Sequence, residues 1–210
     1  GLEFAAYSGI GYWFVRDQYT CEDSFDKELI IERCANPLSV YGDYESKSAT
    51  SDDWMRAFIV DLYTKASFKK KWPKAEAADF DGDMSEEQAL WFAEKKIQVA
   101  EWWTRERVQV ELLKLTDGTI LYKDKFLEVG AEGYSLKDIM AAQGVTVNGT
   151  RKTDTYKVTQ RIMSGCDVLE TNEWKGKYIP IVPCFGNEFN INGKRHFQGL
   201  IRPAKDPARM

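Results

Sequence analysis

Five carboxylates lie close together near the middle of the chain, and their type and spacing suit the binding of a metal ion. They are Asp79, Asp81, Asp83, Glu86 and Glu87. Carboxylate oxygens are ligands that calcium and magnesium prefer, and a metal held this way could serve a hydrolase. The EF-hand template does not fit, because counting from Asp79 puts the glycine at loop position 4 and Leu90 at position 12. We therefore interpret residues 79–87 as a solvated acidic loop inside a surface insertion, residues 74–90, and keep a metal-dependent hydrolase-type domain as an alternative.

Nucleophiles and zinc ligands are sparse in the rest of the sequence. His196 is the only histidine, and the four cysteines are scattered without a C-x-x-C pair: Cys21, Cys34, Cys166 and Cys184. A zinc site or a cysteine–histidine pair would have to be assembled from distant segments. The sequence also lacks a G-x-S-x-G elbow, an H-E-x-x-H helix, a P-loop and a dinucleotide fingerprint. We therefore predict no catalytic residue, no metal and no cofactor. We expect reduced thiols packed in the core, with a disulfide between distant cysteines as the alternative.

A basic patch surrounds a tryptophan at Lys69–Trp72, with Lys65 and Lys74 beside it. Such a patch could contact phosphate or the acidic face of a partner. The simpler interpretation is the solvated face of a helix over residues 65–72, with Phe68 and Trp72 packed inward because they are four residues apart. The formal net charge of the whole chain is −4, which does not predict tight binding of nucleic acid.

Trp102 and Trp103 are adjacent within a predicted strand, so their side chains point to opposite faces. Either both faces of that strand are covered or one tryptophan lies at an interface. Aromatic residues are enriched at interfaces between proteins. We therefore name Trp102 and Trp103 as a candidate subunit interface.

Alternating apolar residues predict strands over much of the chain, at 12–16, 29–34, 57–63, 96–115, 156–163, 179–184 and 196–201. Asp117 and Gly118 predict a hairpin turn. A capping box at Ser135 and Asp138 predicts a helix that ends at Gly144, and Ser51 followed by two acids predicts another helix N-terminus. We therefore expect an α+β fold, mainly antiparallel β-sheet with several short helices.

Two features of the last third of the sequence predict an edge strand and the start of a helix. Pro180 and Pro183 flank two β-branched residues, and neither can donate a ladder hydrogen bond, so this strand must lie at a sheet edge or enter a turn. Asp206 is predicted to cap a helix whose first residue is Pro207, so residues 205–210 begin a helix. We therefore expect the chain to be a fragment of a longer protein.

These segments resemble the portal proteins of P22-like phages, the head-to-tail connectors. The matching residues in the last third are Ile179, Pro180, Val182, Pro183, Gly186, Gly199, Arg202, Lys205, Asp206 and Arg209. Further segments, 9–15, 24–31 and 99–103, resemble the family in the same order, so the resemblance covers residues 4–210. Cys184 and Ala208 depart from the valine and glutamine that are usual there.

The resemblance implies a structural protein and not an enzyme. Family members form a homo-oligomeric ring, usually of about twelve subunits, at one capsid vertex of the virion after assembly in the bacterial host cytoplasm. The ring passes double-stranded DNA without sequence recognition, docks the terminase, scaffolding and tail adaptor proteins, and involves no membrane. Residues 1–210 would be a wing-type domain fragment, and the helix begun at 205–210 would lead into the stem.

Two structural outcomes would separate these alternatives. Convergence of the acidic loop with His196 in a deep pocket would favour an enzyme. An open sheet edge and exposed apolar surface would favour a ring subunit that awaits its neighbours. A generic protein-binding module remains a third alternative.

Overall fold

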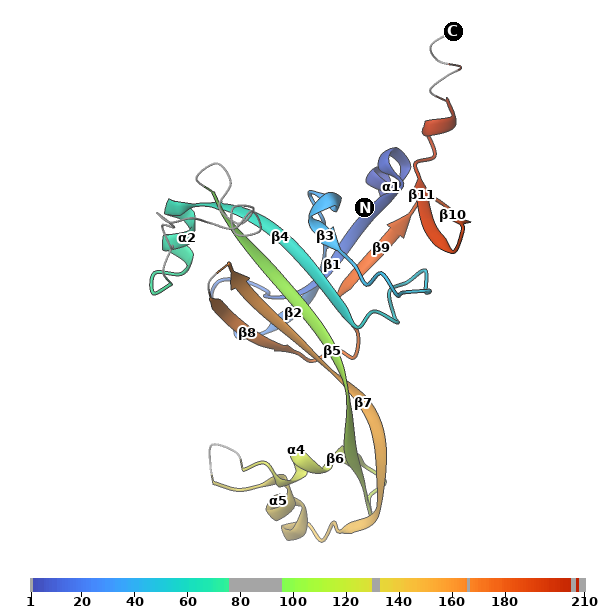
Figure 1. The fold of residues 1–210 in the computed structure, drawn as a ribbon. Coiled ribbons are helices and arrows are strands. Elements are labelled where there is room, and N and C mark those ends of the chain that lie inside the picture. The colour runs from blue at the N-terminus through green and yellow to red at the C-terminus, as the bar shows by residue number, and fades with distance from the viewer. Residues whose placement is uncertain (1, 76–95, 130–132, 166, 205–206, 208–210) are drawn as a thin grey trace. The chain divides into compact units, whose positions relative to one another are not determined.

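The computed structural model describes residues 2–75, 96–129, 133–165, 167–204 and 207 (Figure 1). The chain divides into two compact units, unit 1 with residues 1–105 and 158–210, and unit 2 with residues 106–157. Antiparallel strands dominate and the helices are short, so the predicted α+β class is confirmed. The predicted acidic loop at 79–87 and most of the predicted insertion lie outside the described residues.

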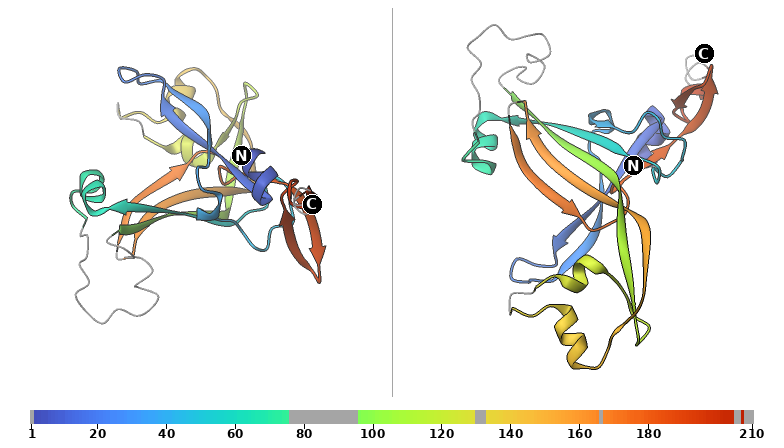
Figure 2. Two further views of the ribbon diagram at one scale, coloured as in Figure 1. Left: turned by 90° about the horizontal axis from the view of Figure 1, so that it is seen from above. Right: turned by 60° about the horizontal axis from the view of Figure 1, so that its bottom comes forward.

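The first sheet of unit 1 has three antiparallel strands in the order β2-β1-β9. Helix α1 (Leu2–Ser8) precedes β1 (Ile10–Tyr19), which forms a hairpin with β2 (Lys27–Arg33) and pairs on its other side with β9 (Ile181–Phe185). β9 occupies one edge of this sheet, as its prolines predicted, with Pro183 opposite Tyr12. The hairpin of β1 and β2, in blue, is separated from the helix α2 in teal (Figure 2).

The second sheet follows the order β3-β4-β5-β7-β8, with β6 paired to β5. After the 3-10 turn η1 (Pro37–Ser39), its strands are β3 (Val40–Tyr41), β4 (Arg56–Thr64), β5 (Lys96–Leu115), β6 (Ile120–Tyr122), β7 (Val147–Ser164) and β8 (Val168–Trp174). β5 is one strand of 20 residues with the bounds that the sequence predicted. β5 and β7 both run on from unit 1 into unit 2.

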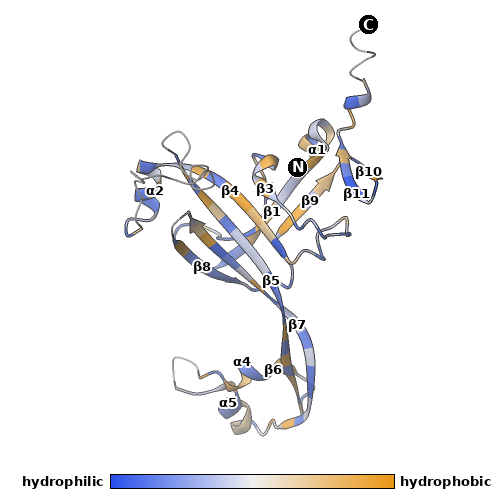
Figure 3. Cartoon of the chain, viewed as in Figure 1, coloured by the Kyte–Doolittle hydropathy of each residue, from blue (hydrophilic) through white to orange (hydrophobic). Residues whose placement is uncertain are grey.

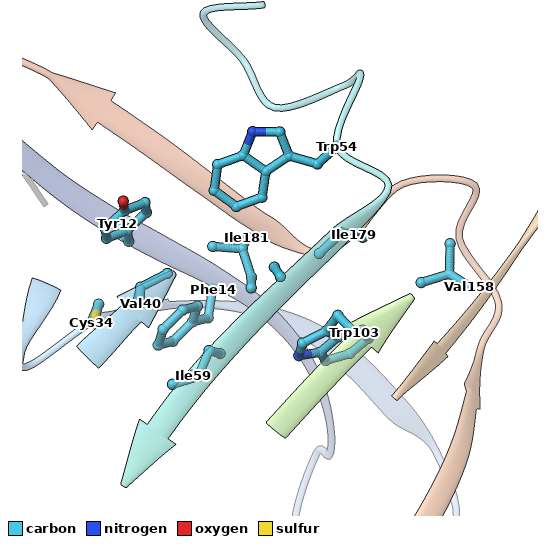
Figure 4. Close-up of a cluster of buried hydrophobic side chains, with 11 residues drawn as sticks. Tyr12, Phe14, Cys34, Val40, Trp54, Ile59, Trp103, Val158, Ile179 and Ile181 are labelled. Carbon is cyan, nitrogen blue, oxygen red and sulfur yellow. The ribbon is translucent and has the colours of Figure 1, made fainter. Parts of the chain in front are cut away.

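The main core of unit 1 lies between its two sheets. Apolar stretches on β4 and β9 are visible in Figure 3, and they contribute Ile59 and Ile181 to this core. Figure 4 shows these side chains with Phe14 from β1 and Trp103 from β5. Burial of each large apolar side chain stabilises the fold by roughly 1.5–3 kcal/mol, and because these side chains come from both sheets, their burial holds the sheets together.

Helix α2 (Lys65–Lys71) closes a second core cluster in unit 1. The Thr64 hydroxyl oxygen accepts a hydrogen bond from Ser67 N at 3.2 Å and caps the helix. Phe68 is fully buried and packs against Trp72, with 5.3 Å between ring centroids. These two aromatic residues pack inward as the sequence predicted, and the lysines of the segment are exposed.

Unit 2 contains α4 (Lys123–Leu127), α5 (Leu136–Ala142) and the β5–β6 hairpin. The predicted turn lies at Asp117, whose carboxylate accepts a hydrogen bond from Thr119 N at 2.8 Å. The predicted capping box is present as well, because Ser135 N donates to Asp138 Oδ2 at 3.0 Å while Asp138 N donates to Ser135 Oγ. Leu113, Leu115 and Phe126 form the small core of this unit.

The predicted helix N-terminus at Ser51 is wrong. Ser51 has a φ of 60°, and its hydroxyl donates to Ile181 O at 2.6 Å instead of capping a helix. The Asp53 carboxylate accepts from the Ser46 hydroxyl at 2.7 Å and from two preceding backbone N–H groups. Side-chain oxygens of this kind compete with helical hydrogen bonds, so the segment folds as a loop bound to β9.

The end of the described chain is a second antiparallel hairpin and a short turn. β10 (Asn187–Ile191) pairs with β11 (Lys194–Gln198), and the 3-10 helix η3 (Arg202–Ala204) follows. The predicted helix start at 205–210 falls outside the described residues, apart from Pro207. Of the cysteines, Cys34 is buried, but Cys21 is exposed, so the expectation that every thiol packs in the core is wrong for Cys21.

Candidate functional site

Three glycines of the family-like segments meet where α1 ends. Gly9 follows α1 with a φ of +93°, and its carbonyl oxygen accepts a hydrogen bond from Gly186 N at 2.9 Å. A methyl group placed on Gly199 would lie only 2.3 Å from the carbonyl oxygen of Tyr7. The absence of side chains therefore lets the N-terminal helix, the end of β9 and the segment after β11 approach backbone to backbone.

The proline-containing segment joins this cluster to the core. Ile179 and Ile181 are buried, and the carbonyl oxygen of Pro180 accepts a hydrogen bond from Val15 N at 2.9 Å. Val182 points away from the core and is partly exposed. The structure thus brings Ile179, Pro180, Val182, Pro183, Gly186 and Gly199 to one edge of the first sheet. Arg202 is exposed in η3, and Lys205, Asp206 and Arg209 lie outside the described residues.

The two adjacent tryptophans occupy different environments. Trp103 is 6% exposed and meets the Trp174 ring edge-on, with 6.3 Å between the centroids. Trp102 lies on the opposite face, stacked on Phe58 at 5.8 Å with the Arg161 guanidinium 5.3 Å from its ring centroid. Trp103 is thus part of the core, while Trp102 is half-buried and is the member of the pair that another subunit could still contact.

A polar network lies beside the main core. The Arg16 guanidinium is 3.5 Å from Glu101 Oε1 and 3.1 Å from Glu32 Oε2, and Gln160 donates to Glu101 at 3.0 Å. Arg16, Glu101 and Gln160 line a small cavity of 120 Å³. Burial, together with the nearby Glu101, raises the pKa of the Asp61 carboxyl above its ordinary range. The network supplies paired charges for packing, and no nucleophile with an adjacent base is among its members.

His196 lies on the β10–β11 hairpin, where it is exposed and stacked on Phe189 with 6.0 Å between ring centroids. Within the described residues, no group of three or more histidine, cysteine or acidic side chains is placed to hold a metal. The carboxylates of the acidic loop lie outside the described part, so the structure does not join them to His196.

The edge strand β2 exposes apolar side chains to solvent. The strand lies at the edge of its sheet, and Leu29 and Ile31 on one face are 70% and 72% exposed. Phe25, in the turn before β2, is 98% exposed. Alternation predicted the strand at 29–34 but did not indicate that its apolar side chains would be exposed. The signal that could have revealed the exposure is the acid-rich turn around Phe25, since a buried turn would not hold so many carboxylates.

An exposed sheet edge that carries apolar side chains is a surface that a neighbouring subunit could cover. No helix in the described part of the chain is long and apolar enough to cross a membrane.

A comparison with protein families supports the same class. The model of the phage P22-like portal protein family matches residues 1–210. The chain therefore belongs to this family, whose members are structural proteins that form an oligomeric ring at the capsid vertex of the phage particle. A search of curated proteins found no match.

Proposed function

We propose that this chain is part of a portal subunit through whose ring double-stranded DNA is packaged into the phage head and later ejected. The observation that carries the proposal is the family match over all 210 residues. The exposed edge strand β2 supports it, because a subunit of a closed ring must present surface that its neighbour covers.

In this proposal residues 1–210 form a wing-type domain of the subunit, and residues 205–210 begin the helix that leads toward the stem. The ring has about twelve copies, in agreement with closed cyclic symmetry. It is assembled in the host cytoplasm and docks the terminase, scaffolding and tail adaptor proteins. The DNA passes without sequence recognition, and the net charge of −4 suits a surface that does not bind phosphate tightly.

The role is structural, so no residue of the chain is assigned to catalysis. Hydrolysis of ATP during packaging belongs to the terminase motor, and the sequence of this chain holds no P-loop. Among the residues of the family-like motifs, Gly186 and Gly199 join α1 to the end of β9 and to the segment after β11. Trp102 is proposed to lie at a contact between subunits.

Deletion of the gene from its phage or prophage tests the packaging role. The expected result is heads that contain no DNA, with packaging restored by the gene in trans. Heads that fill with DNA normally after the deletion would contradict the proposal.

A further inference from the structure

The tip of the β1–β2 hairpin presents an aromatic side chain on a strongly acidic loop. Phe25 is 98% exposed, and residues 17–28 carry five acids and one lysine, a formal charge of −4. The tip is held by its own hydrogen bonds, because Asp26 N donates to Ser24 Oγ at 2.9 Å and Thr20 N donates to Asp26 O at 3.0 Å. Phe25 is therefore presented by an ordered turn, which lowers the entropy lost on binding.

A cavity of 440 Å³ opens elsewhere in unit 1, beside α2 and the start of β8. The described residues that line it are Lys71, Trp72, Pro73, Lys74, Ala75, Asp167, Val168 and Leu169. The indole of Trp72 is fixed in the wall, since its Nε1 donates to Glu170 Oε1 at 2.6 Å. Most of the described lining residues are apolar, and the charged ones are two lysines and one aspartate.

The segment that forms this rim is the most basic part of the chain. Residues 65–75 contain five lysines and no acid, a formal charge of +5. Figure 3 shows α2 as a mostly hydrophilic helix. Charge of opposite sign on the hairpin tip and on this rim favours their association and orients it.

From this complementarity we propose that Phe25 of one subunit inserts into the α2–β8 cavity of a second copy of the chain, with Asp23 and Asp26 facing Lys71 and Lys74. The hairpin tip and α2 are separated within one chain (Figure 2), so the tip reaches this cavity only in another copy. A contact between two unlike surfaces is heterologous, and repeated heterologous contacts close into a ring when their rotation permits. The inference rests on the proposed function and names the surfaces that join the ring.

Cross-linking of the whole product of the gene tests the contact. Phe25→Cys and Val168→Cys are placed together in a background in which Cys21, Cys166 and Cys184 are replaced by serine, so that the buried Cys34 is the one native thiol left. Assembled particles are then treated with a short bifunctional thiol reagent. We expect a ladder of covalent oligomers on a denaturing gel. The single variants, and a matched pair of Phe25→Cys with Lys114→Cys in unit 2, should give no ladder.

Charge exchange provides a second measurement that a folding defect cannot imitate. Asp23→Lys with Asp26→Lys, and separately Lys71→Glu with Lys74→Glu, should each lower the fraction of protein in rings at least tenfold. All four substitutions together should restore the rings, whereas Lys69→Glu with Lys70→Glu, on the same helix but outside the cavity, should leave them intact.

The outcomes separate this inference from the function on which it rests. Rings that form without a specific ladder, and that tolerate both charge reversals, overturn the contact while the portal role stands. That result would also follow if residues of the same chain fill the cavity. An unmodified protein that forms no rings overturns the portal role, and the proposed contact falls with it.

Discussion

Replacing Gly199 with alanine tests whether the family-like glycine motif joins α1 to the end of the chain. The added methyl group would lie 2.3 Å from Tyr7 O and 2.7 Å from Ala6 O, far inside normal contact distance. Both obstacles are backbone atoms, so relief requires α1 or the segment after β11 to move. Overpacking that shifts a backbone costs about 1–3 kcal/mol, and we expect the upper part of this range, about 2–3 kcal/mol.

Urea unfolding followed by tryptophan fluorescence measures this change in unit 1. All seven tryptophans, Trp13, Trp54, Trp72, Trp91, Trp102, Trp103 and Trp174, belong to unit 1 and none to unit 2. With a denaturant slope of about 2 kcal/mol/M, the midpoint should fall by about 1–1.5 M. Leu200→Ala removes an exposed side chain at the next position and should change stability by less than about 0.5 kcal/mol. A Gly199→Ala midpoint as high as that of the control would refute the close approach.

Three further predictions concern the packing of α2, the cap of α5 and the Asp61 carboxyl. Phe68→Ala empties a fully buried site and should cost about 3–5 kcal/mol by the same urea assay, while Lys69→Ala should be neutral; equal midpoints for the two would contradict the inward packing of α2. Ser135→Ala removes the cap of α5 at a cost of about 1 kcal/mol, visible as faster amide exchange across residues 136–142; unchanged exchange would argue against the capping box. Burial and Glu101 raise the pKa of Asp61 above 3.8, so its contribution to stability is complete below that value and is lost as the pH rises through the folded-state pKa. Asp61→Asn should therefore be more stabilising at about pH 7 than at about pH 3. The difference should be at most about 1 kcal/mol, because the side chain is partly exposed. An equal effect on stability at both pH values would contradict the raised pKa of Asp61.

Local signals in the sequence predicted most of the elements correctly. The bounds of β5, the Asp117 turn, the capping box of α5 and the edge position of β9 each follow from residues within a few positions of the feature. In each case the cause lies within a few residues. A proline has no N–H to donate to a neighbouring strand, and the Ser135 hydroxyl accepts a hydrogen bond from the backbone N–H three residues later.

Features that depend on distant partners could not be predicted in this way. The loop at Ser51 resembles a helix start in isolation, but its hydroxyl is bound by Ile181, 130 residues away. The exposure of Leu29 and Ile31 depends on β2 lying at a sheet edge, which alternation does not reveal. The need for glycine at position 199 likewise depends on the close approach of α1, which the sequence around Gly199 does not reveal. Of the candidate interface residues, sequence spacing correctly placed Trp102 and Trp103 on opposite faces, but only packing distinguishes the buried Trp103 from Trp102.

Negative-stain electron microscopy of the whole product of the gene tests the central claim most directly. Portal function predicts uniform rings with a central hole and about twelve-fold rotational symmetry. Uniform small particles without rings, at high protein concentration and across a range of salt concentrations, would contradict the claim that this family member builds a portal.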